Sequence, residues 1–112
     1  MYKDYDMEVK YQIYATEEFL NDYEKLSKSE KERIDKIREQ LKENPYVGRP
    51  LGYKFFREKR VDGKRIYFLI YEDVVIVLVV AISDKKAQQA TIDKIKMAFE
   101  LYKKDVYEKF KK

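Results

Sequence analysis

The sequence predicts an α+β domain with the element order β-α-α-β-β-β-α. We expect an antiparallel four-stranded sheet backed by an αα-hairpin, with a helix at the C-terminal end. Three observations lead there: two amphipathic segments follow each other early in the chain, Asp62-Gly63 marks a hairpin turn, and Val74 to Ile82 is entirely apolar. The 112 residues correspond to one domain, 1–112, with 1–7 as an N-terminal extension and 107–112 as a frayed tail.

The first two elements are a strand and a helix. Apolar and polar side chains alternate from Val9 to Tyr14, which predicts a half-buried strand. Thr16 is suited to cap the helix that follows, because its hydroxyl can accept a hydrogen bond from a free backbone N–H of the first turn. The apolar stripe of this helix is Phe19, Leu20, Tyr23 and Leu26.

A second helix and a loop come next. Ser29 followed by Glu32 matches a capping box and predicts the start of this helix. Its apolar stripe is Ile34, Ile37 and Leu41. Asn44-Pro45 ends it, since proline disfavours the α conformation in the residue before it. We expect a loop from Tyr46 to Gly52, where glycine and proline recur.

Three strands and a last helix complete the chain. The Asp62-Gly63 turn joins strands near Tyr53–Val61 and Lys64–Tyr71. A second tight turn at Glu72-Asp73 leads into Val74–Ile82, a central strand because it is apolar on both faces. Ser83 or Asp84 is expected to cap the final helix. The stripe of that helix is Ile92, Ile95, Phe99, Tyr102 and Val106.

The turn also fixes which side chains share a face. A two-residue loop puts Arg60 directly opposite Arg65, and alternation then sets the two faces. One face carries Lys54, Phe56, Glu58, Arg60, Arg65, Tyr67 and Leu69. The αα-hairpin is expected on the other face, over Ile66, Phe68 and Ile70, with Arg57 and Lys59 at its edge. Arg60, Arg65 and Tyr67 would then lie on an open, concave face.

Positive charge is concentrated on this hairpin. Lys54 to Arg65 holds six cations and two anions, and its net charge equals the +4 of the whole chain. Like charges directly opposite each other in a sheet are unfavourable, so an anion between Arg60 and Arg65 would explain the pair. Two alternatives remain, in which both guanidinium groups extend into solvent or Glu58 bridges them.

Composition excludes several kinds of chemistry. The chain contains no histidine and no cysteine, so Ser-His-Asp and Cys-His catalysis, disulfides and the usual zinc sites are excluded. We expect no cofactor and no metal. The longest apolar run has nine residues, from Val74 to Ile82, which is too short to span a bilayer. The first residues do not match a signal peptide, and we expect a cytoplasmic protein with no membrane partner.

The order and several segments resemble the RelE/ParE toxin superfamily over about Val9 to Phe99. The stretch Arg60-Val-Asp-Gly-Lys-Arg-Ile-Tyr-Phe68 is similar to that family's R-x-[GD]-[GD]-Y-R-[ILV]-x-Y strand pair. Phe68 stands at the final tyrosine of this pattern and Lys64 at the inner one. The other segments that carry the resemblance are Phe19 to Leu26, Leu41 to Pro45, Pro50-Leu51 and Ser83 to Gln89.

The resemblance implies a toxin of a type II toxin–antitoxin system that cuts mRNA on the ribosome. In such enzymes the ribose 2′-OH attacks the adjacent phosphate and the 5′-oxygen leaves, without a metal. It implies a cognate antitoxin, the ribosome and mRNA as partners. The candidate catalytic residues are Arg65, Arg60, Lys85, Lys86, Glu58 as a general base and Tyr67 for stacking or proton transfer. The candidate RNA-binding residues are Lys54, Arg57, Lys59 and Lys64.

Two further functions stay open. The segment Ala87 to Ile92 has neither the tyrosine nor the histidine that RelE-type enzymes often carry there. This departure favours a ParE-like or nuclease-inactive relative that acts by binding a protein. A plain RNA-binding module without a toxin role is the other alternative.

Overall fold

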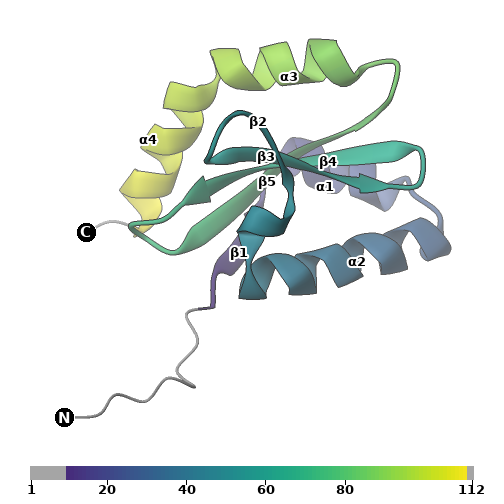
Figure 1. Cartoon of the computed structure of the whole chain (residues 1–112), viewed down its shortest axis with the longest axis horizontal. Helices are drawn as coiled ribbons and strands as arrows, with labels where there is room; N and C mark the ends of the chain where they lie inside the picture. The colour runs from purple at the N-terminus through teal and green to yellow at the C-terminus, as the bar shows by residue number, and fades with distance from the viewer. Residues whose placement is uncertain (1–9, 111–112) are drawn as a thin grey trace.

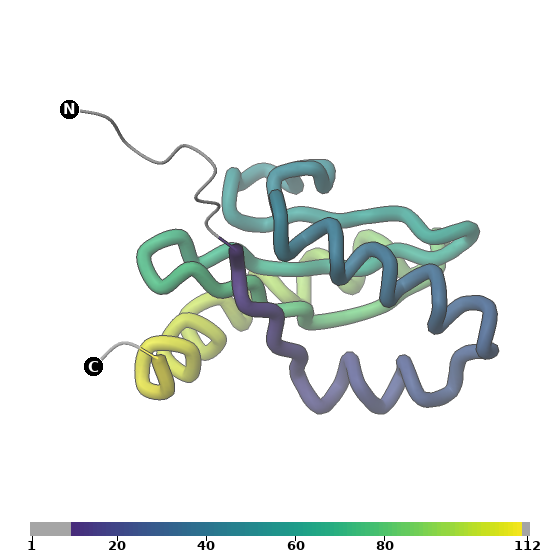
Figure 2. Tube along the Cα trace, turned by 90° about the horizontal axis from the view of Figure 1, so that it is seen from below, coloured from purple at the N-terminus to yellow at the C-terminus, as the bar shows by residue number. Residues whose placement is uncertain are grey.

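The computed structural model describes residues 10–110, so the predicted extension at 1–7, the strand start at Val9 and the last two residues lie outside the described part. The elements are β1 (Gln12–Ala15), α1 (Glu17–Glu24), α2 (Lys28–Glu43), η1 (Pro45–Val47), β2 (Arg49–Tyr53), β3 (Phe56–Val61), β4 (Lys64–Tyr71), β5 (Ile76–Asp84), α3 (Gln88–Met97) and α4 (Phe99–Phe110). Helices cover both faces of a central sheet, with α1 and α2 on one side and α3 and α4 on the other (Figure 1 and Figure 2). Among these residues, no helix combines the length and apolar character needed to cross a membrane.

The sheet differs from the predicted four antiparallel strands. Within residues 10–110 it has five strands in the order β1-β5-β4-β3-β2. The antiparallel meander of β3, β4 and β5 is as predicted, with Asp62-Gly63 as the turn between the first two. β1 runs parallel to β5. Tight turns impose an antiparallel direction on the strands they join, but no turn joins β1 to its neighbour, so alternation alone could not give its direction.

The additional strand, β2, replaces most of the predicted loop from Tyr46 to Gly52. It pairs with β3 at the edge of the sheet, where proline is tolerated because one side of the strand needs no partner. Its register shifts between Pro50 and Tyr53, and Gly52 has a positive φ of 89° at that point. The strand matters for the site because it places Arg49 opposite Glu58.

The αα-hairpin begins and ends close to the predicted positions. The Thr16 hydroxyl accepts a hydrogen bond from the Phe19 N–H at 3.1 Å, and α2 ends before Asn44-Pro45 as predicted. The capping box uses Ser27 and Glu30, so the predicted pair, Ser29 and Glu32, is wrong. Both serines stand three residues before a glutamate, so the capping-box pattern alone does not distinguish them.

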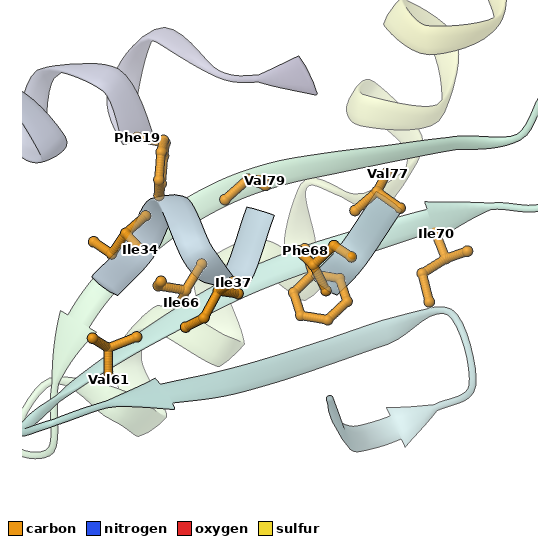
Figure 3. Packing of buried hydrophobic residues seen from close by; sticks show 10 residues of the cluster. Phe19, Ile34, Ile37, Val61, Ile66, Phe68, Ile70, Val77 and Val79 are labelled. Atoms are coloured by element: carbon orange, nitrogen blue, oxygen red, sulfur yellow. The ribbon is translucent and has the colours of Figure 1, made fainter. Parts of the chain in front are cut away.

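The first hydrophobic core joins this hairpin to one face of the sheet. Phe19, Ile34 and Ile37 of the two helices face the sheet side chains in Figure 3. The sheet contributes Val61, Ile66, Phe68, Ile70, Val77 and Val79. The prediction that the αα-hairpin covers Ile66, Phe68 and Ile70 is therefore confirmed.

The opposite face was predicted to be open, and this prediction is wrong. α3 and α4 cover it and form a second core with Phe56, Tyr67, Leu69 and Val80. The expected single helix is two helices that meet at Ala98, although no glycine or proline marks the break. The predicted stripe from Ile92 to Val106 does pack on this face. The helix continues to Phe110, into the segment predicted to fray.

A bulge in β5 aligns the end of that strand with the hairpin. Tyr67 pairs with Ala81, whereas Phe68 pairs with Val79, so Val80 has no partner of its own. Val80 and Ala81 both pack into the second core. After this shift, Ser83 lies directly opposite Arg65. A bulge of this kind redirects the side chains beyond it, and here it brings β5 and the start of α3 to the arginine pair.

Candidate anion-binding site

Two arginines from neighbouring strands form the centre of the candidate site. Arg60 of β3 is paired with Arg65 of β4, in the predicted register. Arg60 is exposed, whereas Arg65 is only 4% exposed. Among the described residues, no group accepts a hydrogen bond from the buried Nε of Arg65. The site therefore combines an exposed arginine with a buried one whose Nε has no hydrogen-bond acceptor among the described residues.

A buried carboxylate lies beside the arginines. Glu58 is 1% exposed and accepts hydrogen bonds from Nε2 of Gln88, at 2.9 Å to Oε1 and 3.3 Å to Oε2. Its ion pair in the described structure is with Arg49, 3.7 Å from Nη1 to Oε2. Glu58 is thus held by the edge strand and by the first residue of α3. The alternative in which it bridges Arg60 and Arg65 is not observed.

Tyr67 is fully buried between Glu58 and Ser83. Its hydroxyl lies 2.7 Å from the Ser83 hydroxyl, which donates to the Asp84 carbonyl oxygen at 3.0 Å. Since serine has one proton to donate, Tyr67 is the donor in the first bond. Burial raises the pKa of Tyr67, the Ser83 hydrogen bond lowers it, and the charge of Glu58 raises it again. Tyr67 is therefore protonated at neutral pH.

Arg57, predicted to bind RNA, has its guanidinium group occupied within the protein. Nε donates to the Lys54 carbonyl at 2.9 Å, and Nη1 donates to the carbonyls of Tyr46 at 3.1 Å and Gly48 at 2.6 Å. The guanidinium carbon also lies 5.0 Å from the centre of the Tyr46 ring. This arginine fastens the η1–β2 connection to β3.

The remaining predicted cations differ in their surroundings. Lys64 is half-buried and lies 3.8 Å from Glu30 of α2, on the αα-hairpin side of the sheet. Lys54 is exposed and lies 5.2 Å from the Tyr46 ring centre. Lys85 and Lys86 are exposed in the connection from β5 to α3. That connection is folded by Asp84, whose side chain accepts the Ala87 N–H at 2.8 Å instead of capping the helix itself.

An open hollow of about 310 Å³ lies against the edge of the sheet at this site. Its lining is Val47, Arg49, Glu58, Lys59 and Arg60. Three cations surround one buried carboxylate, and guanidinium groups bind phosphate oxygens well because two N–H groups can donate in parallel. Sequence reasoning missed Arg49, since its segment was expected to be a loop. It also missed Gln88, whose role depends on the bulge in β5.

Comparison with known structures shows how this arrangement of elements recurs. A double arginine mutant of the Escherichia coli toxin RelE in the free state superposes with a TM-score of 0.68 at 18% identity, covering 79% of this chain and 97% of RelE. This chain has the RelE fold. The resemblance noted in the sequence is thus confirmed for the fold. No family model matches the sequence, and no curated protein matches it.

Two complexes with antitoxins show the same fold. The archaeal RelE–RelB complex from Pyrococcus horikoshii matches with a TM-score of 0.61 at 13% identity, covering 68% of this chain and 96% of that chain. A RelBE toxin–antitoxin complex from Mycobacterium tuberculosis matches at 0.54 and 20% identity, covering 69% and 93%. The RelE fold therefore accounts for nearly all of each neighbour and for most of this chain.

Proposed function

We propose that this protein is a RelE-like toxin that cuts mRNA held in the ribosome, with Arg60 and Arg65 as the phosphate ligands. The observation that carries the proposal is the buried guanidinium group of Arg65, whose Nε has no partner, directly opposite a second arginine. A buried polar group without a partner costs free energy, and so do like charges facing each other. A bound phosphate offsets both costs at once, which a purely structural role for Arg65 does not.

The proposed cleavage of RNA by its own 2′-oxygen requires neither a histidine nor a metal, so it is compatible with a chain that contains no histidine. The 2′-oxygen of the ribose forms a bond to phosphorus, the bond from phosphorus to the 5′-oxygen breaks, and negative charge develops on the phosphoryl oxygens. Arg60 and Arg65 stabilise that charge, as preorganised donors do in other charged transition states. One group must accept the 2′-proton and another must protonate the 5′-oxygen. Glu58 is the proposed acceptor, and Tyr67, Lys85 or Lys86 is the proposed donor.

This reaction requires the start of α3 to move. Glu58 and Tyr67 are buried, and Gln88 holds both carboxylate oxygens of Glu58. Displacing Gln88 would free the carboxylate and expose Arg65 to a phosphate. The ribosome supplies the remaining requirement by holding the RNA in position, because orientation of reacting groups lowers barriers by up to ~7–11 kcal/mol in well-aligned cases.

A cognate antitoxin is the second part of the proposal. Structures with this fold have been solved with the antitoxin RelB bound, in Escherichia coli and in Pyrococcus horikoshii. We propose that a protein of the same kind binds this chain and blocks its activity by coupled folding. Co-expression of such a partner would then restore growth in cells that this protein arrests.

The test compares free mRNA with mRNA in a translating ribosome. Wild type is expected to cut only the ribosome-bound RNA, and Arg65→Met and Arg60→Ala to abolish cleavage while the proteins stay folded. Arg38→Ala is the matched control, because it removes one exposed cation from α2 on the far face of the sheet. Equal cleavage of free and bound RNA would refute ribosome dependence, and full activity of Arg65→Met would refute the site.

A second function is supported by the burial of the proton-transfer candidates. Glu58 and Tyr67 are enclosed, and the segment from Ala87 to Ile92 offers no tyrosine or histidine in their place. Both observations are compatible with a nuclease-inactive, ParE-like toxin that binds a protein target, because such a toxin needs no group for proton transfer. Growth arrest by the wild type without cleavage of either RNA would favour this second function over the first.

A further inference from the structure

A second hollow lies at the other end of the sheet from the Asp62-Gly63 turn. It measures about 420 Å³ and is formed by the end of β4, the β2–β3 turn and α4. Figure 1 shows α4 alongside this end of the sheet. The volume is in the range of known ligand sites. Five aromatic side chains contribute to its lining: Tyr53, Phe55, Tyr71, Phe99 and Tyr107.

The aromatic side chains form a partly exposed wall. The ring centres of Tyr53 and Phe55 lie 5.2 and 5.1 Å from that of Phe99. Tyr53 is 42% exposed and Phe55 is 37% exposed. Tyr71 and Tyr107 meet edge to face, with ring centres 6.0 Å apart. Tyr53 and Phe55 pack against Phe99 but stay partly exposed to solvent. Their exposed apolar area is available for a partner to cover.

The charged side chains around this hollow are mostly acidic. Glu72, Asp73 and Glu100 line it together with one cation, Lys103. Hydrogen bonds from Tyr46 and Tyr11 lower the pKa of Glu72, which is therefore ionised at neutral pH. Burial raises the pKa of Tyr71, and the charge of Glu100 contributes to the rise. The hollow thus has a net charge of about −2 on a chain whose net charge is +4.

Rings of the wall already interact with cations of the chain itself. Nζ of Lys96 lies 5.8 Å from the centre of the Tyr53 ring, and Nζ of Lys103 lies 6.0 Å from that of Tyr107. Cations are attracted to the faces of aromatic rings at such distances. Acidic groups add to this attraction, whereas they repel a phosphate. The chemistry of the hollow therefore selects a cation and disfavours RNA.

We propose that this hollow is a docking site for an arginine or lysine side chain of a partner polypeptide. The cation would enter between the rings and the carboxylates, while the partner's backbone would cover Tyr53 and Phe55. The site shares no residue with the anion-binding site of the hairpin and does not depend on RNA cleavage. The two ends of the sheet would then receive partners of opposite charge.

The test uses a probe peptide, acetyl-Gly-Gly-Arg-Gly-Gly-amide, and a matched peptide with neutral citrulline in place of arginine. Amide chemical shifts of the full-length protein are followed during each titration. The arginine peptide is expected to shift the signals of Tyr53, Phe55 and Glu100 saturably, and the citrulline peptide is not. Two exposed positions on α4 sharpen the test: Glu100→Gln should weaken binding about 2- to 5-fold, and Lys103→Gln should strengthen it by a similar factor.

Three results would overturn the proposal. Equal binding of the citrulline peptide would mean that the hollow recognises no charge. Tighter binding of spermidine than of the arginine peptide would assign the hollow to a small cation. Shifts of the same signals by oligouridylate, at lower concentration than by the peptide, would make it a nucleobase platform. Failure of RNA binding at Arg60 and Arg65 would leave these measurements unaffected.

Discussion

Two arginines on adjacent strands of one hairpin are used in opposite ways. Arg57 donates hydrogen bonds to three backbone carbonyls and stacks on Tyr46. Arg65 is more deeply buried, yet its Nε has no acceptor among the described residues. The first guanidinium group is held by hydrogen bonds inside the protein, whereas the Nε of the second has no such bond to the described residues. We therefore expect Arg57 to contribute to stability and Arg65, under the proposed function, to contribute to ligand binding.

The same substitution at both positions should therefore give different results. Arg57→Met removes the donor for two partly buried carbonyl oxygens and one exposed one, and we expect a loss of roughly 2–4 kcal/mol in the free energy of unfolding. Denaturant titration measures it. A loss under ~0.5 kcal/mol would show that water satisfies these carbonyls equally well and that Arg57 is not structural.

Arg65→Met should leave the free energy of unfolding unchanged or raise it by up to about 1 kcal/mol. Replacing an unpaired buried charge with an apolar side chain of similar length removes a desolvation cost. RNA binding should nevertheless fall by at least about tenfold, because a charge-assisted contact is lost. Strong destabilisation would instead indicate that Arg65 has a structural partner, and the contrast with Arg57 would disappear.

Glu58→Gln examines the negative charge beside Arg65. The amide can keep a hydrogen bond with Gln88 but no longer repels a phosphate, so binding of uncut RNA should rise by about 2- to 5-fold. Cleavage on the ribosome should fall, because the amide cannot accept the 2′-proton. Filter binding and a cleavage assay on the same preparation separate the two effects. Unchanged cleavage would remove Glu58 from the proposed mechanism.

Alkaline titration gives the smallest effect and tests whether the site is closed in solution. Burial raises the folded-state pKa of Tyr67 above its ordinary value of 10.0. The unfolded chain therefore loses this proton first, and the stability contributed by neutral Tyr67 falls as pH rises above 10 and through the folded pKa. Tyr67→Phe should lose less stability between pH 9 and pH 11 than the wild type, by about 1 kcal/mol or less. Equal losses would mean that Tyr67 is already open to water.

Local sequence patterns correctly predicted most of the helices and strands and the hairpin of β3 and β4. Asp62-Gly63 fixed the pairing of Arg60 with Arg65, and Thr16 and Asn44-Pro45 marked helix ends correctly. The αα-hairpin was also placed on the correct face of the sheet, over Ile66, Phe68 and Ile70. These features depend on residues that are close together in the sequence.

Features that depend on distant contacts were missed. Alternation gives the two faces of a strand but not what covers each, so the burial of Arg65 was not foreseen. The direction of β1, the strand around Arg49 and the bulge at Val80 each depend on pairing across the sheet. The Gln88–Glu58 contact joins residues 30 apart in the chain. The pairing of Arg60 with Arg65 was thus predicted correctly, while the burial of Glu58, Arg65 and Tyr67 was not predicted.

The most direct test of the central claim is the salt dependence of RNA affinity for wild type, Arg65→Met and Arg38→Ala, with stability measured on the same samples. Each phosphate contact contributes to the slope of log K against log salt. We expect Arg65→Met to stay folded, to bind more weakly and to reduce the slope by about one, whereas Arg38→Ala matches wild type. An unchanged affinity and slope for folded Arg65→Met would contradict the assignment of Arg65 as a phosphate ligand.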